Sequence, residues 1–416
     1  MKKLLNKTLL NRKLFIFCYV LGFILKGFII HFIPLFGEVY RWLFIIWAIL
    51  LIGKDLIKNQ IQWDIFQKVL WGFLGVALLA SALGPQGISF AVLESLLEYL
   101  IHAYLFFTAY RFYEKDTYQN FLDHMMLCAG AVILSIASFS LLFLLLYRLH
   151  IFLPFNLNSY ERLFTYGHKE EIDRFCGLFG YSTYGGSLCM VAILIALHFE
   201  NKKRIPPLFS LFSVIILTIT IYCLDVRADM IVISFIFLII YYRFLKNKVS
   251  GKKGNIIFGA SIVAVLFLFL ILKQSSIHSF ILKFQQNPTE TLIVASTGRY
   301  RFWSIILNRI HERPVLGWGW LCSDIINYFD AHNLFMNLLM WTGLTGLSVF
   351  LLFLLIMLRK ISVNKTTIHR LGNDWLFILL LCVLLESMFE RNIVGTFYNT
   401  GTSLFWLAGG FLSDNH

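Results

Sequence analysis

Charged side chains are scarce in this chain of 416 residues, where they make up 14%, while hydrophobic residues make up 58%. The mean hydropathy is +0.74. Apolar segments long enough to cross a bilayer recur from one end to the other, so no soluble domain of ordinary size fits between them. The short alternating strands of a membrane β-barrel are also lacking. We therefore predict an all-α polytopic protein in which residues 1–416 form a single membrane domain.

Cysteine pairs and metal motifs are also lacking. The seven cysteines show no paired spacing, and most of them lie inside apolar segments, where a free cysteine behaves as a small packing residue. We interpret Cys18, Cys128, Cys189, Cys223 and Cys382 in this way. The aspartates form no cluster with the spacing of metal ligands, so we expect no metal and no cofactor.

Hydropathy predicts about twelve transmembrane helices. We place them at 14–36, 40–53, 66–83, 89–110, 119–147, 176–198, 207–223, 228–246, 256–273, 333–358, 375–391 and 399–413. The first apolar segment is too long for the core of a signal peptide and has no cleavage site with small residues, so we predict a retained helix.

Basic residues orient the predicted helices. Five of them precede the first span, and further clusters at 54–58, 111–115, 202–204, 243–253 and 359–370 fall on the same side if every segment crosses. The positive-inside rule makes that side cytoplasmic, with both termini there. The net charge of +13 is spread over short loops, which indicates contact with membrane lipids and argues against nucleic-acid binding.

Two predicted loops on the opposite face are long. One spans 149–175, and the other spans 274–331, between the ninth and tenth helices. Loops of this length are usually lids, binding surfaces or disordered segments. Helical spacing of Ile277, Phe280, Ile281 and Phe284 predicts an amphipathic helix, which either lies on the membrane or packs against the bundle.

A histidine stands at the mouth of the tenth predicted span. His332 and Asn333 open the segment Leu334 to Leu358, which contains no charged residue. The imidazole is therefore expected at the membrane surface, where it can exchange protons with water. The alternative is a solvated interface residue without a chemical role.

Two arginines are predicted on the same face as His332. Arg227 lies in a short turn between two spans, and Arg299 follows a threonine and a glycine in the long loop. Either arginine could serve a structural pair, for example Arg227 with Asp225 or Asp229. The planar guanidinium also suits a phosphate or pyrophosphate group. Two such arginines beside a histidine indicate a phosphorylated lipid head group as ligand.

The histidine motif resembles that of a known family. His332-Asn333, nine further residues, then Gly343 and Gly346 are similar to the His-Asn-x9-Gly-x-x-Gly pattern of the O-antigen ligase and polymerase superfamily. The layout, with about twelve spans and a large loop before the histidine span, resembles that superfamily along nearly the whole chain. The chain length is closer to the O-antigen ligases than to the longer protein O-oligosaccharyltransferases.

Arginine motifs carry the same resemblance. Arg227 stands in a Val-Arg-Ala setting, and Gly298-Arg299 is followed by Arg301 and Trp303. Arg174 opens a segment, Arg-Phe-Cys-Gly, that is similar to the Arg-x-x-Gly segment before a span of that family. One departure is the turn at 224–226, which has no threonine or serine. A hydroxyl contribution from that turn is therefore not expected.

The resemblance implies a reaction on the periplasmic face of a bacterial inner membrane. A glycan on undecaprenyl pyrophosphate would be transferred to a sugar hydroxyl of lipid A-core, with inversion, during lipopolysaccharide biosynthesis. Arg227 and Arg299 would stabilise the pyrophosphate, His332 would act as the base and Asn333 would position a ligand or the loop. Supporting roles fall to Arg174, Arg301, Gly343 and Gly346. The donor is already activated, so no nucleotide is needed.

Other interpretations stay open. A polymerase would use the same donor with a lipid-linked acceptor, and a flippase for lipid-linked oligosaccharide would also need many spans and basic residues. Transporters of this size often have two similar halves, whereas the long loop and the His332 motif occur once. Carboxylates within or near spans are either functional or paired with a basic residue. These are Glu94, Glu98, Glu386 and Glu390. We expect Lys26 and His31 to reach the membrane interface.

Overall fold

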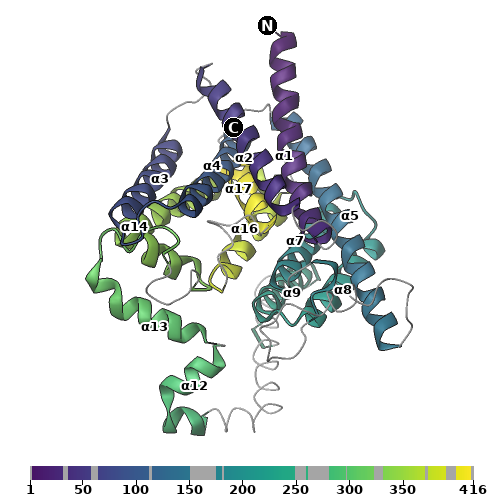
Figure 1. The fold of residues 1–416 in the computed structure, drawn as a ribbon. Helices are drawn as coiled ribbons and strands as arrows, with labels where there is room; N and C mark the ends of the chain where they lie inside the picture. The colour runs from purple at the N-terminus through teal and green to yellow at the C-terminus, as the bar shows by residue number, and fades with distance from the viewer. Residues whose placement is uncertain are drawn as a thin grey trace.

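The computed structural model is helical throughout the part of the chain that it describes, with no strand there (Figure 1). The described residues are 2–30, 36–57, 64–111, 115–149, 175–179, 182–248, 259–260, 281–296, 298–322, 331–370, 373–389 and 400–413. A helix satisfies all of its own backbone hydrogen bonds, which is what an apolar segment needs in lipid.

Most of the helices belong to a bundle. They are α1 (Lys2–Ile30), α2 (Phe36–Ile57), α3 (Ile65–Leu83), α4 (Phe90–Arg111), α5 (Lys115–Arg148), α7 (Ser182–Asn201), α8 (Pro207–Leu224), α9 (Arg227–Lys248), α14 (Leu334–Val363), α15 (Lys365–Arg370), α16 (Asp374–Glu386) and α17 (Thr400–Ser413). Shorter elements are η1 (Gly177–Phe179), α12 (Pro288–Ala295), α13 (Arg299–Arg309) and η2 (Ile310–Glu312).

The helices agree with a polytopic membrane protein. Within the described residues six helices, α3, α4, α5, α7, α8 and α14, are long and apolar enough to cross a membrane. Helices α1, α2, α9, α16 and α17 also coincide with predicted spans. The predicted span 256–273 lies outside the described residues except for 259–260, so the total of about twelve stays a prediction.

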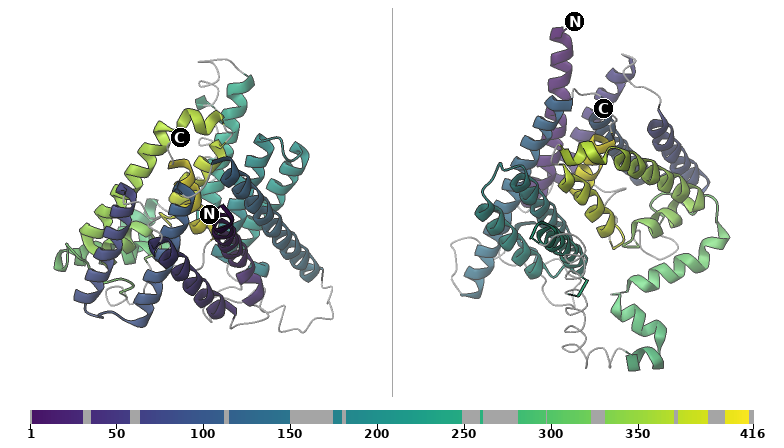
Figure 2. Two further views of the ribbon diagram at one scale, coloured as in Figure 1. Left: turned by 90° about the horizontal axis from the view of Figure 1, so that it is seen from above. Right: turned by 180° about the vertical axis from the view of Figure 1, so that it is seen from behind.

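Helices α1 and α2 run in opposite directions. Near the start of α1, Arg12 forms a buried ion pair with Asp55 at the end of α2, and the hydroxyl of Tyr104 donates to the same carboxylate over 3.2 Å. Near the other end of α1, the hydroxyl of Tyr184 donates to the Phe23 carbonyl oxygen. These contacts define two sides of the bundle. We call them the N-terminus side, after the chain end marked N in Figure 2, and, opposite it, the His332 side.

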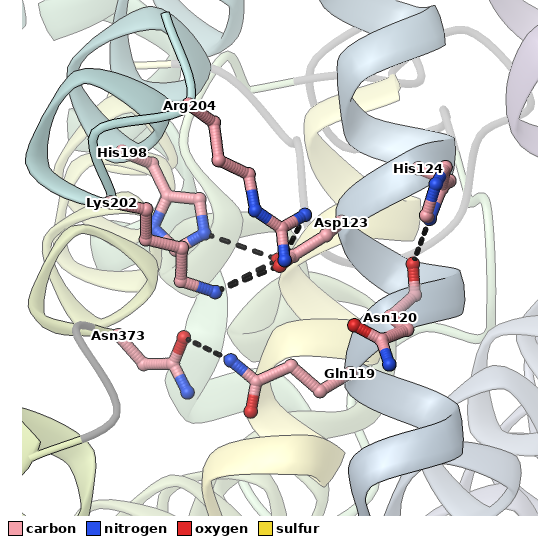
Figure 3. A network of polar contacts seen from close by, with 8 residues as sticks. All are labelled: Gln119, Asn120, Asp123, His124, His198, Lys202, Arg204 and Asn373. Carbon is pink, nitrogen blue, oxygen red and sulfur yellow. Dashed lines mark hydrogen bonds and ion pairs between the residues drawn. The ribbon is translucent and has the colours of Figure 1, made fainter.

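A buried carboxylate joins α5 to the end of α7 on the N-terminus side (Figure 3). Lys202 Nζ donates hydrogen bonds of 3.0 Å to both carboxylate oxygens of Asp123, and Arg204 Nη1 lies 3.1 Å from Asp123 Oδ2. His198 Nε2 is 3.4 Å from Oδ1. Burial lowers the pKa of the Lys202 ammonium, and the Asp123 charge opposes that shift. The cluster satisfies a charge that would otherwise be costly to bury.

Two of the predicted carboxylates within spans are paired. Arg41 on α2 places Nη1 2.9 Å from Glu94 Oε1 and Nε 3.3 Å from Glu98 Oε1, both on α4. This arrangement confirms the ion-pair alternative for these two residues. The interface interpretation of Lys26 is wrong, because the bundle encloses this side chain, which is 4% exposed. His31 lies outside the described residues.

Helix α14 is broken in its middle. Gly343 has φ 64° and ψ −164°, values that no helical residue has and that glycine adopts at low cost. The break admits another part of the chain, because a Cβ atom on Gly317 would lie 2.5 Å from the Gly343 nitrogen. A Cβ atom on Gly343 itself would meet the Val315 carbonyl oxygen. Both glycines are therefore required by a close backbone approach.

Residues 313–320, which we call the strap, fill the break. The amides of Trp318 and Gly319 donate to the carbonyls of Met340 and Trp341 over 2.9 and 3.0 Å. On the far side of the break, two α14 amides donate to the carbonyls of Pro314 and Val315 over 2.8 and 3.1 Å. The strap thus replaces the intrahelical bonds that the break removes.

The strap is also bound to α3. Arg313 Nη1 donates to the Leu83 carbonyl oxygen over 2.9 Å, and the Trp320 amide donates to Ser81 Oγ over 3.0 Å. The chain that precedes the strap, α12 and α13, extends beyond the bundle on the His332 side (Figure 1). The predicted amphipathic segment is described only from residue 281, where Ile281 and Phe284 are exposed; Ile277 and Phe280 lie outside the described residues.

Candidate functional site

His332 adopts an unusual backbone conformation at the start of α14. Its φ of 49° lies in the left-handed region, which is costly for a residue with a side chain. The side chain is half-buried. The next residue, Asn333, caps α14, since its side-chain oxygen accepts a hydrogen bond of 3.0 Å from the Met336 amide. The histidine therefore sits at the mouth of this helix, as the sequence predicts.

The His332 loop, residues 331–333, is fixed by its neighbours. Asn333 Nδ2 donates to the Met388 carbonyl oxygen over 2.7 Å, and the Leu334 amide donates to the Ser387 carbonyl oxygen over 2.9 Å. These bonds hold the loop against the end of α16. On its other side, the Ala331 amide donates to Asn337 Oδ1 over 2.8 Å. Sequence reasoning missed Asn337, although a polar residue inside an apolar span was the available signal.

Arg299 is the first residue of α13. The preceding Gly298 has φ 86°, a left-handed value that favours glycine and lets the chain turn into the helix. Trp303 lies one turn further on the same helix face and donates a hydrogen bond of 2.8 Å from Nε1 to the Ala331 carbonyl oxygen. The α13 face that carries Arg299 is therefore the face bound to the His332 loop. Arg301 is exposed and lies off that face.

Arg227 is the first residue of α9. Asp225 ends α8 with φ 51°, and the side chains of Val226, Ala228 and Asp229 are buried, whereas Arg227 is exposed. The Arg227 side chain has no ion pair with any residue that the structure describes. The pairing of Arg227 with Asp225 or Asp229 is thus not formed. The turn points the guanidinium away from the packed core.

Helix α9 presents Arg227 on the His332 side. The guanidinium of Arg243, near the other end of α9, lies 4.8 Å from the ring centroid of Trp375 at the start of α16. The two helices pack against each other, so they run antiparallel. The first turn of α9 therefore lies toward the end of α16, which also holds the His332 loop.

A second chain of contacts supports this placement. Asp229, in the first turn of α9, packs against Gly186 on α7, where a Cβ atom would meet its carboxylate. The adjacent Ser187 donates to Glu386 Oε2 over 3.3 Å. Glu386 is the last residue of α16, next to the residue that accepts from the Leu334 amide. The start of α9, the start of α7 and the His332 loop are thus neighbours.

The segment that follows Arg174 reaches the same side. Arg174 itself lies outside the described residues, as does Glu390. Gly177 has φ 56°, and a Cβ atom there would lie 2.8 Å from Ser140 Oγ. That hydroxyl accepts from the Leu178 amide over 2.9 Å. The glycine of the Arg-x-x-Gly segment thus permits a close approach to α5.

Gly343 and Gly346 have structural tasks in α14. Gly343 allows the break, and a Cβ atom on Gly346 would meet the side chain of Thr342. Neither glycine needs to touch a substrate to explain the spacing of the motif. Sequence reasoning named both residues but missed the strap, whose Gly317 and Gly319 also have positive φ.

The described part of the chain contains no cluster of metal ligands, and its cysteines form no disulfide. No three histidine, cysteine or carboxylate side chains gather there as metal ligands. The cysteines of these residues are free thiols, of which Cys189 and Cys382 are buried and Cys128 is exposed. The expectation that the protein needs no metal stays a prediction.

The arrangement favours chemistry on an anionic ligand. Arg227 and Arg299 start two helices on the same side of the bundle, and His332 lies in a loop bound to one of these helices and next to the other. Guanidinium groups stabilise phosphate charge, and a neutral imidazole accepts a proton.

Comparison with known proteins gives one partial relative. The plasma membrane ascorbate-dependent reductase of Rattus norvegicus is 27% identical over 144 residues, which are 32% of this chain and 49% of the reductase. The chain thus spans about half the length of this curated relative.

The family comparison coincides with the site. Residues 211–351 match the O-antigen ligase family. The matched region begins in α8 and includes Arg227, Arg299, the strap and His332 with both glycines of its motif. The match therefore agrees with the resemblance that the sequence bears to the O-antigen ligase and polymerase superfamily.

Proposed function

We propose that this protein is a glycosyltransferase of the O-antigen ligase type. It transfers a glycan from undecaprenyl pyrophosphate to a sugar hydroxyl of lipid A-core. The family match supports a ligase or polymerase function in lipopolysaccharide biosynthesis. The observation that carries the proposal is the hydrogen bond from Trp303 to the Ala331 carbonyl oxygen, because it joins the Arg299 helix to the His332 loop.

In the proposed reaction, His332 removes the proton of the acceptor hydroxyl as its oxygen attacks the anomeric carbon. The bond from that carbon to the pyrophosphate oxygen breaks, and undecaprenyl pyrophosphate leaves with the electron pair. Arg227 and Arg299 stabilise the charge that develops on the leaving group. A single displacement inverts the anomeric centre, and no covalent enzyme intermediate forms.

The roles of the remaining residues follow from their contacts. Asn333 holds the His332 loop against α16 rather than binding substrate, since both groups of its amide are engaged by backbone. Gly343 and Gly346 shape α14. Arg174 and Arg301 are proposed as supporting residues for an anionic substrate.

The proposed location is the inner membrane of a bacterium. The His332 side faces the periplasm and both termini face the cytoplasm, because the basic loops lie on the N-terminus side. Exposed Arg227 and the helices α12 and α13 then face the periplasm, a compartment without ATP. A preactivated donor suits that compartment.

The test is transfer by purified protein in nanodiscs. Lipid-linked glycan and lipid A-core are supplied, and the product is measured by gel mobility and mass spectrometry. We expect glycan on lipid A-core, in the presence of EDTA as well. Elongation of lipid-linked glycan without lipid A-core would instead identify a polymerase. Translocation without any new glycosidic bond would overturn the proposal in favour of a transporter.

A further inference from the structure

An indole group links α13 to the His332 loop. Trp303 Nε1 donates to the Ala331 carbonyl oxygen over 2.8 Å, and this tryptophan is half-buried. The bonded carbonyl belongs to the peptide group that joins Ala331 to His332. The orientation of this peptide plane sets φ of His332, which has the left-handed value of 49°.

Both sides of His332 are therefore held. The preceding peptide is fixed by Trp303 at its oxygen, and the Ala331 amide is bound to Asn337 over 2.8 Å. The following residues are fixed by the Asn333 cap and by the bond from the Leu334 amide to Ser387. A left-handed residue relaxes to a commoner conformation unless its surroundings hold it. Loss of the Trp303 bond would remove one of these restraints.

Trp303 also fixes Arg299. The two residues are four apart on α13 and share a face. The tryptophan thus lies between the guanidinium and the imidazole loop, bound covalently to one helix and by a hydrogen bond to the other segment. The α13 helix otherwise extends beyond the bundle (Figure 1), so its position depends on contacts of this kind.

We propose that Trp303 is a positioning residue that keeps Arg299 and His332 in register through its hydrogen bond to the Ala331 carbonyl oxygen. The inference rests on the proposed function, because it assigns the pair to donor and acceptor chemistry. Trp303 touches neither substrate. Its effect is on the separation and orientation of the two groups, and small misplacements of catalytic groups lower rates strongly.

The matched variants are Trp303→Phe and Trp320→Phe. Each substitution keeps an aromatic ring and removes one indole donor. The Trp320 indole donates to Ser95 Oγ over 2.9 Å in the bundle, away from the His332 loop. We expect W303F to lower kcat by about tenfold or more with donor Kd unchanged, and W320F to lower thermal stability with kcat retained. Equal kcat in W303F and wild type would overturn the inference.

A second readout does not depend on activity. Spin labels at Arg301→Cys and Met388→Cys, both exposed positions, report the separation of α13 from the end of α16 in a variant whose native cysteines are replaced. We expect a narrow distance distribution in this background and with W320F, and a broad one with W303F. An unchanged distance distribution with W303F would contradict the proposed positioning role of Trp303. If the wild-type protein shows no transfer but W303F still broadens the distance distribution, the result counts against the proposed function and not against the role of Trp303.

Discussion

Asn333 and His332 are adjacent, yet their side chains have different tasks. Both groups of the Asn333 side-chain amide are bonded to backbone. The oxygen accepts from the Met336 amide, and the nitrogen donates to the Met388 carbonyl oxygen. His332 has a half-buried ring and a strained backbone. The pair therefore combines the proposed base with the residue that anchors its loop, and strained backbone of this kind is common at functional sites.

Replacement of His332 by alanine should lower transfer by about 10²-fold to 10⁴-fold while donor binding survives, because the base is lost and the arginines remain. The wild-type rate should fall at acidic pH, because a protonated imidazole can no longer accept a proton. Rate and donor binding are measured across pH. The control is His311→Ala in η2, an exposed histidine of the same loop region.

An H332A protein that transfers at a wild-type rate would reduce His332 to an interface residue. If that variant fails to bind donor, His332 belongs with the arginines as a pyrophosphate ligand. The fall in rate at acidic pH should persist in His311→Ala. If the residual activity of His332→Ala shows the same fall, His332 is not the base.

Replacement of Arg227 by alanine should lower transfer about 10²-fold or more, because the exposed guanidinium is free to stabilise the leaving pyrophosphate. The Arg227→Lys variant should regain little of the transfer rate, since an ammonium cannot make a bidentate contact with a phosphate. Initial rates are compared with those of Arg148→Ala, an exposed arginine at the end of α5 on the same side. Full activity of Arg227→Lys would contradict the bidentate contact, and an equal loss in Arg148→Ala would indicate a general charge effect.

At the scale of elements, the broken helix α14 explains the spacing of its motif. The nine residues between Asn333 and Gly343 carry the chain from the loop to the break, where the strap docks. Because α13 leads through η2 into the strap, the arginine helix is fixed to α14 at two points. One is the Trp303 bond, and the other is the backbone pairing at the break.

Replacement of Gly343 by alanine should destabilise the protein by about 1–3 kcal/mol, because the added Cβ meets the Val315 carbonyl oxygen at positive φ. The control is Gly75→Ala on α3, where nothing lies within 4 Å of the new Cβ atom and helix propensity favours alanine. Thermal unfolding in detergent measures both. Equal stability of the two variants would show that the break tolerates a side chain.

At the scale of the whole molecule, charges within the bundle are arranged in groups that satisfy one another. Asp123 gathers basic groups on the N-terminus side (Figure 3), and Arg12 pairs with Asp55 there. Arg41 binds two carboxylates in the other half. Such groups join separate helices, and each is costly to leave incomplete.

Replacement of Arg41 by methionine should destabilise the protein by about 3–5 kcal/mol, because Glu94 and Glu98 lose their partner in a buried place. Additional Glu94→Gln and Glu98→Gln substitutions should recover much of the loss. For comparison, Arg309→Ala breaks an exposed pair with Glu312 and should leave the unfolding temperature nearly unchanged, because water screens that pair. If the triple variant is no more stable to unfolding than Arg41→Met, the unpaired buried carboxylates are not the cause of the lost stability.

Local sequence properties determined the class of the protein and the positions of the proposed site residues. Hydropathy predicts helices from windows of about twenty residues, and eleven of the predicted segments coincide with helices among the described residues. The placement of His332 at a helix mouth and of Arg227 and Arg299 at turns also follows from local pattern. The count of spans and the side that faces the periplasm remain predictions.

The tertiary structure alone decided which distant groups meet. Lys26 was misread because composition cannot tell whether a basic residue in a span faces lipid or the bundle. The strap, Asn337 and the Trp303 bond connect segments through contacts that hydropathy does not encode. The physical reason is that apolar character is set residue by residue, whereas a hydrogen bond or a close backbone approach depends on how whole helices pack.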